Sequence, residues 1–234
     1  MSGYEYHTKI GSSTNIGTDC KILSNADVVH PGGVRGRIVS TSDSDSSTGT
    51  GIQKVILDYY ITNWTHKTEV ITLNGTTPVD TTETDIYRIE SLEAFKVGSG
   101  NISAGTITLK SIDGASLFAQ IDTGREMFER CLFYSELGAI CTPISAALSS
   151  SSSGGVVFCV FATVDNTADG GSHVLKSYVS VEVKQSAVQI NLNGTILMDM
   201  TEETSGLGIC ITARGLSAGQ TGTATLICRD YHID

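Results

Sequence analysis

Apolar and polar residues alternate along much of the chain after Gly51. In the stretch 52–61, Val55 and Leu57 fall on one face of an extended chain and the residues between them on the other, because successive side chains of a strand point to opposite sides. The stretch 86–97 repeats this pattern. A period of two is typical of strands with one buried face, so both stretches are predicted strands.

A tight turn is predicted between these two strands. Residues 69–79 are Glu-Val-Ile-Thr-Leu-Asn-Gly-Thr-Thr-Pro-Val. The β-branched and apolar residues at 70–73 favour a strand, and Asn74-Gly75 favours a reversal because both residues tolerate a positive φ. Pro78 has no N–H to donate, so it belongs at a strand start or a sheet edge. The order of these segments predicts an antiparallel meander that carries the core.

The same reasoning predicts strands along the rest of the chain. They are expected at 34–39, 106–109, 117–121, 156–164, 174–183, 188–192, 207–213 and 223–231. Tight turns are expected at Asp113-Gly114, Asp169-Gly170-Gly171 and Asn193-Gly194, and a flexible loop at 149–155. Residues 125–134 fit both a helical stripe and a strand, and the β-rich surroundings favour the strand.

The first fifty residues differ from the rest of the chain. Isolated apolar residues such as Tyr6 and Ile16 stand among Gly, Ser, Thr and Asn, and the stretch 40–49 is rich in Ser, Asp and Thr. Such a segment buries little by itself, so it is either a mobile tail or an arm that lies on a neighbouring subunit. We therefore expect two parts: residues 1–50 as an N-terminal arm and Ser/Asp/Gly-rich linker, and 51–234 as one β-sandwich domain.

Composition supports an all-β protein. The chain has 234 residues with 25 glycines, and only 17% of its residues are charged. The net charge is −10 and the sequence pI is near 4.9. The chain lacks the clustered Lys and Arg residues that binding to nucleic acids requires. Residues 1–10 lack the apolar segment of a signal peptide, and no apolar run is long enough to span a bilayer. We expect a soluble protein made in the cytoplasm, with no nucleic-acid or membrane partner.

The cysteines and histidines predict no metal site. None of them stands at the close spacing of zinc ligands. The cysteines are expected to be small buried hydrophobic residues in a reducing compartment, and the histidines to be exposed. They are Cys20, Cys131, Cys141, Cys159, Cys210 and Cys228, with His7, His30, His66, His173 and His232.

Several carboxylates and turn motifs are candidates for site chemistry. Asp43-Ser44-Asp45-Ser46 resembles a calcium loop but lacks its glycine and distal glutamate, so a solvated linker is favoured. The pairs Glu202-Glu203 and Glu83 with Asp85 could serve a glycosidase, but aromatic residues are only 6% and predict no sugar cleft. The four Asn-x-Ser/Thr sites, at Asn63, Asn74, Asn101 and Asn193, are interpreted as turn chemistry. We predict no catalytic residue, no cofactor and no metal.

One part of the chain resembles a known group of proteins. The matching segments are Val55-x-x-x-Tyr59, Trp64, the run 69–79, Thr-Asp-Ile-Tyr-Arg-Ile at 84–89, Gly-Thr-Ile-Thr-Leu at 105–109 and Ala-Gln-Ile at 119–121. Their order resembles small β-rich structural proteins of tailed bacteriophages, over roughly residues 50 to 135. Where that group would have a Pro-Gly turn, this chain has Ser135-Glu136-Leu137-Gly138.

The resemblance implies a virion component. It implies a β-sandwich, jelly-roll-like, that does no catalysis and packs against other virion proteins, most simply as a decoration or cement protein on the capsid shell. Its partners would be the major capsid protein and further copies of itself, as a homo-oligomer such as a trimer. Its location would be the virion, after synthesis in the host cytoplasm. The alternative is a tail, neck or fibre component that binds host glycans through Trp64, Tyr59 and Tyr60.

Overall fold

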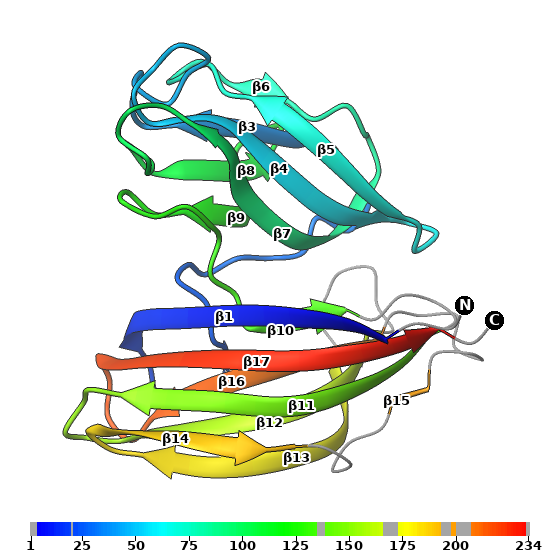
Figure 1. Cartoon of the computed structure of the whole chain (residues 1–234), viewed down its shortest axis with the longest axis vertical. Coiled ribbons are helices and arrows are strands. Elements are labelled where there is room, and N and C mark those ends of the chain that lie inside the picture. Colours follow the sequence, from blue (N-terminus) through cyan, green and yellow to red (C-terminus); the bar gives the residue numbers. More distant parts are fainter. Residues whose placement is uncertain are drawn as a thin grey trace. The chain divides into compact units, whose positions relative to one another are not determined.

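The computed structural model describes residues 4–19, 21–134, 139–165, 173–192, 198–199 and 207–232, and no helix occurs among them. The chain forms two compact units. The described residues of unit 1 come from 4–25, 129–165 and 173–232, and those of unit 2 from 26–128. Each unit is a pair of antiparallel sheets around its own hydrophobic core (Figure 1). The predicted all-β antiparallel sandwich is therefore confirmed.

Unit 1 has two facing sheets (Figure 1). The first has the strand order β1-β17-β11-β14, and the short β15 also pairs with β11. The second has the order β10-β16-β12-β13, and the short β2 pairs with β16. The bounds are β1 (Tyr4–Ile16), β2 (Lys21–Ile22), β10 (Leu132–Tyr134), β11 (Ala139–Ser150), β12 (Val156–Asp165), β13 (His173–Val183), β14 (Ser186–Asn191), β15 (Met198–Asp199), β16 (Leu207–Gly215) and β17 (Gln220–His232).

The connections of unit 1 are those of a jelly roll. In chain order, its longer strands lie in the first sheet (β1), the second (β10), the first (β11), the second (β12 and β13), the first (β14), the second (β16) and the first (β17). Two interlocked Greek keys give this alternation between two sheets. The jelly-roll-like sandwich that the sequence led us to expect is thus present in unit 1.

The core of unit 1 is built by both sheets. Leu148 and Leu226 enter it from the first sheet, and Phe158 and Ile211 from the second, and all four side chains are buried. Strand β17, which carries Leu226, alternates between buried and more exposed residues, whereas β12, which carries Phe158, is apolar along most of its length. Burying one face of each sheet against the other is what holds such a sandwich together.

Residues 4–16 are a strand of unit 1, which differs from the predicted arm. Strand β1 pairs antiparallel with β17, from Tyr4 opposite Tyr231 to Ile16 opposite Gln220. Ile16 and Leu23 pack into the core of unit 1. The chain therefore does not divide into 1–50 and 51–234 as we expected, because the first strand finds its partner at the other end of the chain.

Unit 2 is a second sandwich. Its sheets have the orders β6-β3-β8-β9 and β5-β4-β7 (Figure 1). Ile38 and Leu109 from the first sheet meet Leu57 and Leu92 from the second in a core that excludes water. The bounds are β3 (Gly36–Ser40), β4 (Ile52–Ile61), β5 (His66–Thr72), β6 (Val79–Asp80), β7 (Ile86–Val97), β8 (Ile107–Ser111) and β9 (Leu117–Ile121).

The predicted strands of unit 2 are confirmed, but the predicted meander is wrong. Strands β4 and β7 have the bounds expected from alternation, and the turn at Asn74-Gly75 has Gly75 at a φ of +59°. After β5, however, the chain crosses to the other sheet to form β6. It then returns, and β7 pairs with β4 on the side away from β5. Sheet order depends on these crossings, which local alternation does not report.

Residues 125–134 contain the short strand β10 and isolated bridges at Met127 and Arg130. The strand interpretation is therefore confirmed in part. The turn at Asp113-Gly114 is also confirmed, with Gly114 at a φ of +76° between β8 and β9. The turns predicted at 169–171 and 193–194 lie outside the described residues.

The role of β1 in the fold can be tested at Gly11. A Cβ added there would lie 2.5 Å from the Leu23 carbonyl oxygen and 2.8 Å from the Cys131 Cβ. We expect Gly11→Ala to lower the free energy of unfolding by about 1–3 kcal/mol, because the strand must move away from its neighbours. The control is Gly17→Ala, where an added Cβ would lie 4.0 Å from the Asp19 amide nitrogen and little change is expected. Equal urea midpoints for the two variants would contradict this role.

Candidate functional site

The Ser- and Asp-rich stretch expected to be a solvated linker is ordered around one buried carboxylate. Asp45 is 0% exposed, and its two carboxylate oxygens accept four hydrogen bonds. The donors are the Ser40 hydroxyl at 2.7 Å and the backbone amides of Ile52 at 2.8 Å, Ala104 at 2.9 Å and Gly105 at 2.8 Å. Asp45 thereby ties three separate segments of unit 2 together, so the linker prediction is wrong.

The Asn74-Gly75 turn packs against this stretch. The Gly75 amide donates to the Asp45 carbonyl at 2.8 Å, and the Ser40 amide donates to the Gly75 carbonyl at 3.0 Å. The hydroxyl of Thr76 donates to the Asp43 carboxylate at 2.6 Å and holds the pKa of that carboxyl below its usual range. A Cβ on Gly75 would lie 2.8 Å from the Asp43 Cα, so the turn needs glycine for space as well as for φ.

This arrangement gives the carboxylates of the calcium-loop-like stretch partners within the protein. Both Asp43 and Asp45 use their carboxylates to accept hydrogen bonds from the protein itself. Among the residues that the structure describes, no group of three or more His, Cys, Asp or Glu could hold a metal ion. Within the matched stretch, hydrogen bonds therefore fix the Asn74-Gly75 turn between β5 and β6 to an Asp-centred loop.

The importance of Asp45 can be tested with an isosteric change. In Asp45→Asn, the side-chain amide would turn N–H groups toward backbone donors that now lack an acceptor. We expect a loss of about 2–4 kcal/mol in the free energy of unfolding, because buried unpaired donors are costly. The control is Asp43→Asn, an exposed position whose amide oxygen can still accept from Thr76, with an expected change below about 0.5 kcal/mol. Hydrogen exchange across unit 2 would measure both, and similar protection in the two variants would refute the role of Asp45.

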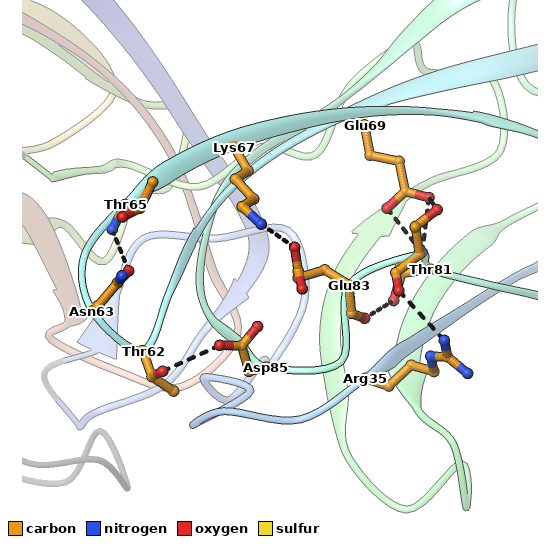
Figure 2. Close-up of polar contacts among 10 residues, drawn as sticks. Arg35, Thr62, Asn63, Thr65, Lys67, Glu69, Thr81, Glu83 and Asp85 are labelled. Atoms are coloured by element: carbon orange, nitrogen blue, oxygen red, sulfur yellow. Dashed lines mark hydrogen bonds and ion pairs between the residues drawn. The ribbon is translucent and has the colours of Figure 1, made fainter.

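A second polar network follows the segment 79–85 (Figure 2). The Glu69 carboxylate accepts from the backbone amide and hydroxyl of Thr82, with distances of 2.9 and 2.7 Å to one oxygen. Lys67 forms an ion pair with Glu83, and the Thr62 hydroxyl donates to Asp85 at 3.2 Å. Each acidic side chain in Figure 2 thus has a partner within unit 2.

The same segment is also anchored to the other sheet of unit 2. Arg37 on β3 makes a two-pronged contact with Asp80, at 2.6 and 3.2 Å. The Thr81 hydroxyl donates to the Gly36 carbonyl at 3.2 Å and accepts from the Gly36 amide at 3.1 Å. Because β5 belongs to one sheet and β3 to the other, the network joins the two sheets at their margin.

The contacts of Glu83 and Asp85 differ from those of a general acid. Glu83 is bound to Lys67, which holds the pKa of its carboxyl below the usual range, and Asp85 is held by Thr62. A general acid needs the opposite, a carboxyl whose pKa is raised toward neutrality. Burial, followed by the charges of Glu69, Glu83 and Asp85, raises the pKa of nearby Tyr59 to about 12. The other candidate pair, Glu202-Glu203, lies outside the described residues.

The Lys67–Glu83 pair leads to a pH prediction. In Lys67→Met, the pKa of Glu83 should rise toward its ordinary value, because the bond to Lys67 is the main cause of the depression. A carboxyl whose pKa is lower in the folded than in the unfolded protein stabilises the fold when the pH is above the unfolded pKa, and this stabilisation is lost as the pH falls through the folded pKa. Because the variant has less of this stabilisation, its free energy of unfolding should fall less on acidification. Carboxyl NMR titration measures the shift, with Lys110→Met as the control. An unchanged Glu83 titration in Lys67→Met would rule out this assignment.

The aromatic residues suggested for glycan binding are mostly internal. Tyr59 and Tyr60 are each 3% exposed, so their rings cannot stack on a sugar. Trp64 is half-buried at the β4–β5 turn, at a φ of +61°, and its ring lies 5.6 Å from that of Tyr60 and 5.4 Å from that of Tyr87. Of the three candidates, only Trp64 offers surface to a ligand.

The turn interpretation of the Asn-x-Ser/Thr sites fits the three that the structure describes. The Asn63 side chain accepts from the Thr65 amide at 3.0 Å, a local bond that closes a turn. Asn101 adopts a φ of +61°, a conformation that asparagine tolerates better than most residues. Asn74 begins the turn that packs against Asp45. Asn193 lies outside the described residues.

The cysteines lie mainly in the interior of unit 1. Cys131, Cys141, Cys210 and Cys228 are buried free thiols, whereas Cys159 is partly exposed, which corrects the expectation for that residue. Burial raises the pKa of Cys131, and a hydrogen bond with Cys228 is the largest cause that raises the pKa of Cys141. Thiols held in the neutral form are poor nucleophiles and poor metal ligands. Cys20 lies outside the described residues.

The histidines are less exposed than expected. His66 is exposed, but His7 and His30 are only partly so. The ring of His7 lies 4.5 Å from that of Phe133, and its Nε2 atom is 3.9 Å from the buried carboxylate of Asp230. The side chains of His173 and His232 lie outside the described part of the chain.

Comparison with known proteins identifies no sequence relative. No family model matches the chain, and no curated protein sequence does. Among solved structures, it is similar to one of infectious bursal disease virus Gt strain, at a TM-score of 0.31 and 9% identity over 95% of this chain and 57% of that chain. For a structure of the Gx strain, the TM-score is 0.30 and the identity 9%, over 99% of this chain and 72% of that chain. For the VP2 subviral particle of that virus, the TM-score is 0.25 and the identity 11%, over 95% of this chain and 62% of that chain.

The chain spans 57% of the first of these structures, and TM-scores of this size do not establish a common topology. Nothing is therefore transferred from those particles to this chain. Within the part of the chain that the structure describes, no helix is long and apolar enough to cross a membrane.

Proposed function

We propose that this chain is a non-enzymatic structural protein of a bacteriophage virion, which decorates or cements the capsid shell through oligomeric contacts. The observation that carries the proposal is the strand order of unit 1, a jelly roll with a second sandwich inserted between β2 and β10. Jelly rolls are frequent in viral capsid domains. Since a fold alone does not define a function, the use of the polar side chains must agree with this role.

The polar groups of the described residues support a structural role. The carboxylates of Asp45, Glu69 and Glu83 all accept bonds from within unit 2. The buried thiols of Cys131 and Cys141 have raised pKa values. These groups fix loops and fill cores. A protein of this kind acts by shape and by contact with other copies and with the major capsid protein.

Purified particles provide the test. We expect mass spectrometry to detect the chain in density-purified virions, and labelling in electron microscopy to place it on the shell. Particles produced without it should break open at a lower temperature, and adding the purified protein should restore their stability. The Asp45→Asn variant serves as a matched control, because a protein with unit 2 destabilised should restore less. Absence of the chain from purified virions would overturn the proposal.

The same experiment decides the alternative role in the tail, neck or fibre. Lectin domains also use jelly rolls, and Trp64 remains partly accessible. Label at the tail end of particles, together with glycan-array binding that Trp64→Ala abolishes, would favour host-glycan binding over shell decoration. Label spread over the shell with no glycan bound would favour decoration.

A further inference from the structure

Strand β14 forms an exposed edge of unit 1. It pairs with β11 on one side and ends the strand order of the first sheet. Residues 186–189 are all exposed, with Val188 at 37%, and Ile190 packs partly against the core. A strand in this position presents unpaired backbone groups to its surroundings.

The register shows which backbone groups point outward. Beside β14, the Leu192 amide donates to the Ile144 carbonyl at 2.8 Å, in line with the β11–β14 register. In an antiparallel pair, hydrogen-bonded and non-hydrogen-bonded positions alternate. Val188 and Ile190 therefore bond to β11, whereas the N–H and C=O groups of Ala187 and Gln189 point away from the sheet.

This edge lacks the usual protection against pairing. Edge strands are commonly shielded by charged residues, proline or a bulge. Strand β14 is Ser-Ala-Val-Gln-Ile-Asn, with no charge and no proline, and its pairing with β11 has no register shift. Three other edges carry charges: β1 contains Glu5 and Lys9, β5 contains Lys67 and Glu69, and β13 contains Lys176 and Glu182. The uncharged edge strands β9 and β10 differ in another way, because the pairing of β9 with β8 has a register shift and β10 is buried.

We propose that β14 pairs antiparallel with β14 of a second copy of this chain, about a twofold axis through Gln189. Outward groups must meet outward groups, so Gln189 faces Gln189 of the second copy and exchanges two backbone hydrogen bonds with it. Val188 then lies opposite Ile190 of the second copy, which extends the apolar face of the sheet across the interface. Such an isologous contact closes on itself and produces a dimer.

Charge favours β14 over the charged edges as the place where a second copy binds. The chain carries a net charge of −10, so two copies repel each other over most approaches. An uncharged strand is where this repulsion is weakest. Pairing over one short strand buries less surface than a standard interface, so the dimer should be reversible and dependent on concentration. The inference deepens the proposed function, on which its purpose in a particle rests.

Charge reversal at Gln189 tests both the edge and its register. Because residue 189 meets itself across the axis, Gln189→Lys and Gln189→Glu should each weaken the dimer about three- to tenfold. Mixing the two variants in equal amounts should restore association as a heterodimer, since Lys then faces Glu. Analytical ultracentrifugation of the full chain over a range of concentrations measures this. The controls are Ala218→Lys and Ala218→Glu, the same charges at an exposed turn position, which should not change dimerisation.

The possible outcomes separate this inference from the proposed function. A wild-type chain that stays monomeric at every concentration, or charge variants that do not recover on mixing, would overturn the β14 dimer. A monomeric chain found on virions would overturn only the dimer. A β14 dimer that is absent from virions would support this interface and refute the virion role.

Discussion

The pairing of the first strand with the last closes the jelly roll of unit 1, and the rest of that unit depends on it. Strand β17 lies between β1 and β11 in the first sheet, and β16 lies between β10 and β12 in the second. Each of the last two strands is therefore a central strand of its own sheet. Removing β1 would expose the edge of β17 and open the core beside Ile16. Because these pairings join residues far apart in sequence, the sandwich cannot close until the end of the chain is available.

Unit 2 fits into this scheme as an insertion with adjacent ends. Where the chain leaves unit 1, the Leu23 carbonyl accepts from the Cys131 amide at 2.9 Å, and the Asn25 amide donates to the Glu129 carbonyl at 3.0 Å. The outgoing and returning segments are thus held together by unit 1 itself. The entropic cost of closing a loop rises only slowly with the length of the loop. An inserted sandwich therefore adds little more to the entropic cost of folding unit 1 than a shorter connection would. Unit 2 then folds around its own core and its own buried acid, Asp45.

The sequence predicted the strands well and their partners poorly. The strands 52–61 and 86–97 were located correctly because alternation is a local property of one strand. Strand β1 was not predicted because it has few apolar residues, and its pairing with β17 cannot be recognised from its own sequence. Asp45 was missed because a Ser- and Asp-rich stretch is usually solvated, and its donors at Ala104 and Gly105 are distant in sequence. The jelly roll itself was expected from a resemblance within 50–135, a stretch that lies mostly in unit 2, whereas the jelly-roll topology lies in unit 1.

The placement of charge links these features to assembly. In unit 2, the acidic residues of the 79–85 network bond to partners within the unit, and these bonds hold the loops in place. In unit 1, Asp230 is buried, whereas β14 carries no charge at all. With the β14 interface that we propose, an acidic protein is repelled by its own copies in most orientations and accepts them along an exposed, neutral sheet edge. Such directional contact is the physical requirement for a part of an ordered shell, because an assembly of defined symmetry needs a few permitted contacts among many disfavoured ones.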